Sequence, residues 1–166
     1  MPFTVTDWMS FVDGSRKLSE LSIPGTHDSA SRYIESNRLT TQTDGIREQL
    51  DSGTRFIDLR VGYTRNTFQL YHEKTFLNLN FGQVRDACRA FLQAHPGETI
   101  ILSLKKEDKA PQGDNEKDGT FQKRFQKYVD ESASLWYLGK DIPTLGEVRG
   151  KIVLFRRFEL DKGTSV

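Results

Sequence analysis

The chain is poor in cysteine and in net charge, and each scarcity excludes a class of protein. Its 166 residues include one cysteine, Cys88, so an internal disulfide framework and a multi-cysteine metal site are both excluded. Lys and Arg together number 24 against 23 Asp and Glu. This balance argues against a general binder of polyanions such as nucleic acid, because no excess of positive charge can neutralise phosphates. Any phosphate chemistry must therefore depend on a few charged side chains at specific positions.

Long apolar runs are missing as well. No run approaches the roughly 20 apolar residues of a membrane span, and the N-terminal segment Met1–Lys17 lacks the basic start and apolar stretch of a signal peptide. Apolar residues nevertheless make up 36% of the chain, with eleven Phe, which is too many for a disordered protein. We therefore expect one folded domain over residues 1–166.

Short apolar segments alternate with helical or polar ones. Strands are predicted at 18–23, 55–61, 67–72, 99–104 and 151–158. Helical segments are predicted at 46–50, 83–95, 121–129 and 145–148, the second being the clearest because of its apolar stripe. The polar segment 109–120 predicts a solvated loop. Strands alternating with helices indicate an α/β fold built from parallel βα units.

Polar clusters lie in or at the ends of the predicted strands. They are His27 and Asp28 after the first, Asp58 and Arg60 on one face of the second, His72 ending the third, and Lys105 ending the fourth. Because active sites of βα barrels gather at the carboxyl ends of strands, we expect these side chains to converge. Two imidazoles and a guanidinium suit phosphoryl transfer: one imidazole takes a proton, the other donates one, and the guanidinium pairs with the phosphate.

Several segments carry a family resemblance. They are Trp8–Met9, Leu21–Ser29, Phe56–Arg60, Leu70–His72, Glu98–Glu107, Gly150–Leu154 and Arg156–Phe158. In this order they resemble the X domain of bacterial phosphatidylinositol-specific phospholipase C, and the match runs across nearly all of the chain. The resemblance implies a TIM-barrel-like α/β fold.

The resemblance also implies catalytic roles. His27 is expected to be the general base for the inositol 2-hydroxyl, and His72 the general acid for the departing diacylglycerol oxygen. Asp28 is expected to orient His72. Arg60, aligned by Asp58, is expected to stabilise charge on the phosphate. The implied products are diacylglycerol and inositol 1,2-cyclic phosphate.

Substrate contacts and surroundings follow from the same resemblance. Lys105 and Arg157 are expected to contact inositol hydroxyls. Family members that depend on a metal place a carboxylate where Arg60 stands, so we expect neither a metal nor another cofactor. The expected partner is a phosphatidylinositol-type lipid at a membrane surface, which suggests a secreted protein or one that acts at a membrane.

The predicted strands are too few for a complete barrel. Such a barrel has eight strands and typically about 250 residues, whereas about five strands are predicted here. The family's remaining strands carry the carboxylate partner of the general base, which has no position in this sequence. We therefore expect a truncated domain or an open partial barrel, with little or no activity of its own. Its last strand, with apolar residues 152–155, would be free for self-association.

Other readings remain open at this point. A metal-dependent hydrolase on the same scaffold, like a glycerophosphodiesterase or sphingomyelinase D, would need metal-binding carboxylates near His27. A lipid head-group binding module would keep the pocket without turnover. Asp58 and Arg60 could form a purely structural ion pair. His95 is expected to be a helix-end residue and Cys88 an inert core residue.

Overall fold

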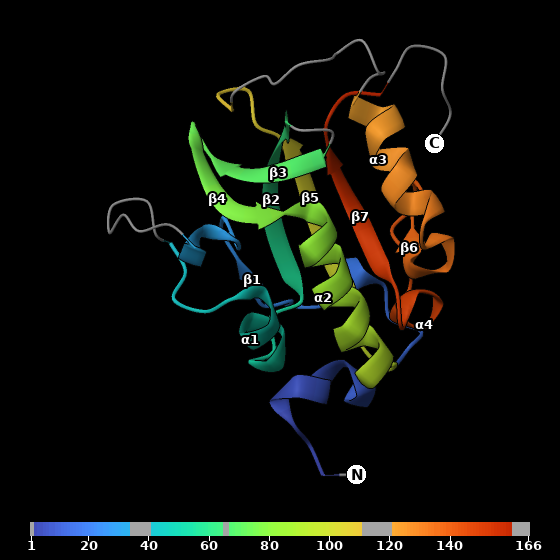
Figure 1. The fold of residues 1–166 in the computed structure, drawn as a ribbon. Coiled ribbons are helices and arrows are strands. Elements are labelled where there is room, and N and C mark those ends of the chain that lie inside the picture. Colours follow the sequence, from blue (N-terminus) through green and yellow to red (C-terminus); the bar gives the residue numbers. More distant parts are fainter. Residues whose placement is uncertain (1, 34–40, 65–66, 111–120, 161–166) are drawn as a thin grey trace.

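A seven-stranded mixed sheet forms the centre of the molecule in the computed structural model, which describes residues 2–33, 41–64, 67–110 and 121–160 (Figure 1). The strands are β1 (Gly25–Thr26), β2 (Phe56–Thr64), β3 (Thr67–His72), β4 (Thr75–Asn80), β5 (Ile100–Lys106), β6 (Trp136–Tyr137) and β7 (Ile152–Arg157). Their order is β4-β3-β2-β5-β7-β6, and β1 pairs with β2 outside this path.

The helices α1 (Ile46–Asp51), α2 (Phe81–Ala94) and α3 (Phe121–Asp130) cover one side of the sheet (Figure 1). The other helices are α4 (Leu145–Val148) and the 3₁₀ helices η1 (Val5–Phe11), η2 (Leu18–Glu20), η3 (Ser31–Tyr33) and η5 (Ala133–Leu135). Buried residues of η1, η2 and α4 form a second, smaller core against Ile101 and Val153, whose side chains alternate along their strands with those of the main core. The helix α2 begins earlier than predicted because Asn80 and Gln83 form a capping box. Within the described ranges, no helix is long and apolar enough to span a membrane.

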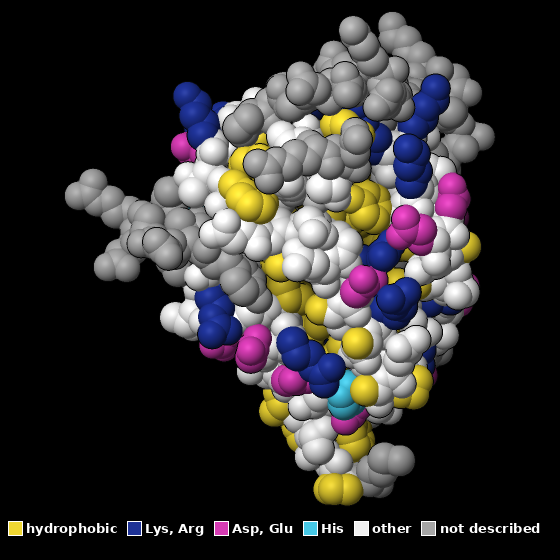
Figure 2. All heavy atoms as spheres, in the orientation of Figure 1, with side chains coloured by type: hydrophobic (Ala, Val, Ile, Leu, Met, Phe, Trp, Pro, Cys, Tyr) yellow, Lys and Arg dark blue, Asp and Glu magenta, His cyan; other side chains and the backbone are white. Residues whose placement is uncertain are grey.

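Alternate residues of the central strands point to different environments. Ile57, Leu59, Leu102 and Leu104 are buried in the main core beneath α1, α2 and α3. The residues between them on β2 are Phe56, Asp58 and Arg60, which therefore face the other side of the sheet. Figure 2 shows the outer surface of the helical layer, where cationic and acidic side chains lie side by side. The polar residues of the candidate site thus lie on the face of the sheet opposite α1, α2 and α3.

The prediction of parallel strands holds for only part of the sheet. The strands β1, β2, β5, β6 and β7 pair in parallel, but β3 runs antiparallel to β2, and β4 antiparallel to β3. The register places Leu70 opposite Val61, so β3 runs back along β2. The registered pairs with β2 end at Leu70, so His72 lies beyond them at the end of an antiparallel strand, not at the shared carboxyl edge of parallel strands.

The prediction of a strand over Leu18–Ile23 is wrong. Residues 18–20 form η2 instead, because the Leu18 N–H donates to the Pro143 carbonyl and the Glu20 carboxylate accepts from the Lys17 N–H. Leu18 is buried in a small second core with Met9, Leu145 and Val148. The first strand starts only at Gly25, where a Cβ would lie 2.9 Å from the Cβ of Phe56. Only glycine permits this close approach.

The exposed edge of β7 is shorter than predicted. The strand β6 pairs with Ile152 and Val153, so the prediction that these two residues lie on an unpaired edge is wrong. The described pairs of the remaining residues, Leu154–Arg157, are all with β5. Phe155 is 54% exposed and its ring packs against Phe56 at 6.1 Å between centroids. An apolar side chain is therefore exposed on the face of the sheet that carries Asp58 and Arg60.

Cys88 and His95, which we expected to have structural roles, both lie in or at the end of α2. Cys88 is fully buried in α2, and burial raises the pKa of its thiol to about 12, so it stays protonated at neutral pH. His95 caps the end of α2, stacks on Phe91 and lies 2.6 Å from a carboxylate oxygen of Asp7 through Nδ1. Both residues lie outside the candidate site.

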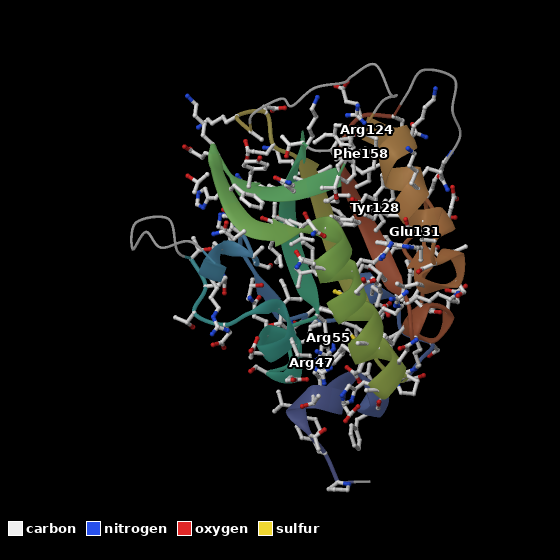
Figure 3. All side chains as sticks on the ribbon, in the orientation of Figure 1. Arg47, Arg55, Arg124, Tyr128, Glu131 and Phe158 are labelled. Atoms are coloured by element: carbon white, nitrogen blue, oxygen red, sulfur yellow. The ribbon has the colours of Figure 1, made fainter. Side chains whose placement is uncertain are left out.

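A buried ion pair anchors the N-terminal segment to the sheet. Arg55 lies near α1 and α2 (Figure 3), and its Nε donates to Glu98 Oε2 at 2.8 Å. Both side chains are fully buried. The Glu98 carboxylate also accepts from the backbone N–H groups of Met9 and Ser10. Burial lowers the pKa of Arg55, and the adjacent Glu98 carboxylate opposes that shift.

Replacement of Glu98 with glutamine should therefore destabilise the fold strongly. The buried Arg55 cation would lose its counter-charge, which costs about 3–5 kcal/mol of unfolding free energy. Glu48→Gln is the matched control, because Glu48 is exposed and lies 3.6 Å from Arg32, and exposed pairs contribute about 1 kcal/mol or less. Urea unfolding measures both variants. Equal losses would contradict a special role for the buried pair.

Candidate active site

The carboxylate of Asp28 lies at the centre of the site. Asp28 follows β1, is buried, and adopts a φ of 45°. Its Oδ2 lies 3.3 Å from Nε2 of His27 and 3.7 Å from Nδ1 of His72. Its Oδ1 lies 2.9 Å from Nε of Arg60 in an ion pair without hydrogen-bond alignment. Both predicted catalytic histidines and the predicted phosphate-binding arginine therefore meet at one aspartate.

Asp58 occupies the other side of the His27 ring. Its Oδ2 lies 3.2 Å from Nδ1 of His27. Its Oδ1 accepts hydrogen bonds from Arg157 Nη1 at 3.0 Å and from Ser103 Oγ at 3.1 Å. The expectation that Asp58 aligns Arg60 is not what the structure shows: the guanidinium paired with Asp58 is that of Arg157, which reaches it past the small side chain of Ser103.

His27 has carboxylates near both ring nitrogens. That the family's carboxylate partner of the general base has no position in this sequence stays a prediction, and Asp28 and Asp58 both lie within 3.3 Å of the His27 ring. The left-handed conformation of Asp28 turns its carboxylate back toward the preceding histidine, an arrangement that strand periodicity does not reveal. The His27 side chain is 64% exposed, so a substrate can reach it.

Glu107 is a site residue that the sequence analysis did not select. It follows β5 directly, and its N–H donates to the Val61 carbonyl at 2.9 Å. Its buried Oε2 lies 3.8 Å from Nη1 of Arg60. Arg60 is thus held by Asp28 and Glu107. Its place in the sequence could have identified it, because Glu107 lies two residues beyond Lys105 in one of the segments that carry the family resemblance.

Three cations lie in register across adjacent strands. Arg60 of β2 pairs with Lys105 of β5, which pairs with Arg157 of β7. Like charges on neighbouring strands repel one another unless anions lie between them. Asp28 and Glu107 neutralise Arg60, and Asp58 neutralises Arg157, whereas in the described part of the chain Lys105 makes no ion pair. The row therefore suits an anionic ligand, and Lys105 is available to it.

Three other residues of the site form a possible set of metal ligands. His27, Asp28 and Asp58 offer ligand atoms within 4.8 Å of one another. Each aspartate already faces a guanidinium, however, with Arg60 2.9 Å from Asp28 and Arg157 3.0 Å from Asp58. A divalent cation would have to lie between two fixed positive charges, which is electrostatically unfavourable. The charges favour a site that works without a metal.

Metal chelation and metal addition should both leave this site unchanged. Neither dialysis against EDTA nor added Ca²⁺ should move the NMR ring resonances of His27 in protein labelled with ¹³C-histidine, because Arg60 already supplies the positive charge. Adding Mn²⁺ to the labelled protein measures this, since a paramagnetic ion broadens only nearby signals. Selective broadening of the His27 signals at micromolar Mn²⁺, or a shift of these signals in EDTA, would contradict a site that works without a metal.

Comparison with known proteins gives this site a family context. The sequence model for the X domain of phosphatidylinositol-specific phospholipase C matches residues 17–158. The chain belongs to this family. This X domain is 35% identical over 160 residues to 1-phosphatidylinositol phosphodiesterase of Staphylococcus aureus, a match covering 91% of the chain and 50% of the relative. It is 34% identical over 163 residues to the enzyme of the same name from Listeria monocytogenes, covering 91% and 48%.

Solved structures agree with the fold. A structure of phosphatidylinositol-specific phospholipase C from Staphylococcus aureus matches this X domain with a TM-score of 0.85 at 34% identity, covering 93% of this chain and 53% of that one. The Listeria monocytogenes enzyme matches with a TM-score of 0.78 at 35% identity, covering 93% and 57%. The α/β, TIM-barrel-like prediction is confirmed. The X domain spans about half the length of these relatives.

Proposed function

We propose that this X domain cleaves phosphatidylinositol by internal attack of the inositol 2-hydroxyl on phosphorus. A bond forms between the 2-oxygen and phosphorus, and the bond between phosphorus and the diacylglycerol oxygen breaks. The products are diacylglycerol and inositol 1,2-cyclic phosphate. The observation that carries this proposal is the carboxylate of Asp28, which lies between His27, His72 and Arg60. This arrangement offers a base, an acid and a fixed cation around one point.

His27 acts as the general base in this proposal. It takes the proton from the 2-hydroxyl as the hydroxyl oxygen attacks, and it becomes an imidazolium. The carboxylates of Asp28 and Asp58, at 3.3 Å and 3.2 Å from its ring nitrogens, stabilise that positive charge and hold the ring. The exposure of the ring lets the inositol approach it.

His72 acts as the general acid, and Arg60 stabilises the phosphate. His72 donates its proton to the departing diacylglycerol oxygen, and the Asp28 carboxylate, 3.7 Å from Nδ1, orients its ring. The guanidinium of Arg60 is fixed by Asp28 and Glu107. A preorganised cation of this kind stabilises the negative charge that builds on the phosphoryl oxygens in the transition state.

Lys105 and Arg157 contact the inositol in this proposal. They share a register row with Arg60, so a head group whose phosphate reaches Arg60 lies across the other two cations. Their N–H groups can donate to ring hydroxyls. The substrate lies in a membrane, and one structure of the Staphylococcus aureus relative concerns modulation of that enzyme's membrane binding.

A substrate analogue provides the test. Vesicles of phosphatidylinositol should yield inositol 1,2-cyclic phosphate, which ³¹P NMR distinguishes from the open-chain monophosphate. A lipid whose inositol 2-oxygen is methylated should not react, because it has no nucleophile. Cleavage of the methylated lipid, or direct formation of the open-chain monophosphate, would show that water attacks the phosphorus and would overturn the proposal.

A further inference from the structure

The turn that carries His27 and Asp28 is held in an unfavourable backbone conformation. It runs from Thr26 to Ser29, and Asp28 adopts a φ of 45°. Residues other than glycine rarely adopt this left-handed region, and they do so where surrounding contacts enforce it. The placement of the Asp28 carboxylate depends on those contacts.

A buried amide from α1 binds both ends of this turn. Gln49 Oε1 accepts a hydrogen bond from Thr26 Oγ1 at 2.7 Å. Gln49 Nε2 donates to the Ser29 carbonyl at 2.8 Å and to the Asp44 carbonyl at 2.7 Å. Both N–H donors of the amide are thus used. Gln49 is buried, so water cannot readily replace these bonds.

The same end of the turn is joined to Asp58. The Asp58 N–H donates to Ser29 Oγ at 2.8 Å, and the Ser29 N–H donates to the Asp58 carbonyl at 3.0 Å. Gln49 therefore supports, through Ser29, the spacing between the two aspartates that flank His27. The carbonyl of His27 also accepts bonds from Thr41 and Gln42, but their side chains are more exposed and compete with water.

We propose that Gln49 is a positioning residue, whose amide holds the turn so that the His27 ring stays between Asp28 and Asp58. It acts through the turn and not on the lipid. Without it, the Thr26 hydroxyl and the Ser29 carbonyl lose buried partners. Asp28 can then relax toward an ordinary φ, which moves its carboxylate away from both histidines.

The ring signals of the histidines test this inference without any need for turnover. The chain has three histidines, so ¹³C-labelled histidine gives three sets of ring resonances. We expect Gln49→Leu to shift and broaden the signals of His27 while those of His95 stay in place. Gln122→Leu is the matched control, because Gln122 is also buried but lies in α3. The inference is overturned if His27 is unchanged in Gln49→Leu, or changes equally in the control.

The catalytic consequence rests on the proposed function. Gln49→Leu should lower kcat by about 10²-fold, the effect of a small misplacement of a catalytic group, and leave KM nearly unchanged because Gln49 does not contact lipid. A change confined to KM would overturn the positioning role. If the unmodified chain releases no cyclic phosphate, the proposed function fails, and the ring signals still decide the role of Gln49.

Discussion

Replacement of His27 or His72 with alanine is expected to lower kcat for phosphatidylinositol cleavage by about 10²–10⁴-fold. His27 must accept the proton of the attacking hydroxyl, and His72 must supply one to the leaving oxygen, so neither can substitute for the other. For the same reason kcat/KM should show a bell-shaped dependence on pH, because one ring must be neutral and the other protonated. Release of inositol 1,2-cyclic phosphate measures the effect.

His95→Ala is the control for these replacements. His95 lies at the end of α2, in contact with Asp7 and Phe91, and should be dispensable for turnover. The double variant His27→Ala/His72→Ala should lose less activity than the product of the two single losses, because base and acid act in one step. Near-normal turnover in either single variant would remove that histidine from the mechanism.

Arg60→Lys is expected to lower kcat by about 10²–10³-fold, the effect of losing a preorganised donor to a developing anion. The planar guanidinium of Arg60 can contact Asp28 and Glu107 and still direct N–H groups at the phosphate. A lysine ammonium keeps the charge but lacks this paired geometry. Steady-state kinetics on phosphatidylinositol vesicles measures the loss.

Arg156→Lys controls for the loss of an arginine near the site. Arg156 neighbours Arg157 in β7 but lies over the ring of Phe158, at 6.0 Å from its centroid, and should tolerate the change. An Arg60→Lys variant as active as Arg156→Lys would show that charge alone suffices and that guanidinium geometry has no role.

The sequence predicted those elements whose signals are local. The bounds of β3 and α4 match the predictions, and α2 differs at its ends by one or two residues. The strand β4 was missed because its hairpin turn lacks the usual glycine or asparagine, and Glu73 adopts the positive φ instead. The two-residue strand β6 is too short to produce a periodic pattern. The predicted loop at 109–120 lies almost entirely outside the described residues.

The sequence predicted which residues form the candidate site better than it predicted which of them contact one another. The motif positions selected the two histidines, Asp28 and Arg60, and the structure places these four side chains together. The pairing of Asp58 with Arg157 depends on the register of three strands and on the small side chain of Ser103, which local patterns do not encode. The contact of Asp28 with both histidines depends on one left-handed residue. These determinants are non-local or conformational.

The most direct measurement is cyclic phosphate release by this 166-residue chain on phosphatidylinositol vesicles, compared with the double variant His27→Ala/His72→Ala. We predict inositol 1,2-cyclic phosphate from the unmodified chain only. Its rate should fall below the roughly 1–10³ per second typical of enzymes, because the sheet face beside the site is open at Phe155 and water is not fully excluded. Equal release by both proteins, or none by either, would contradict the assignment of the site.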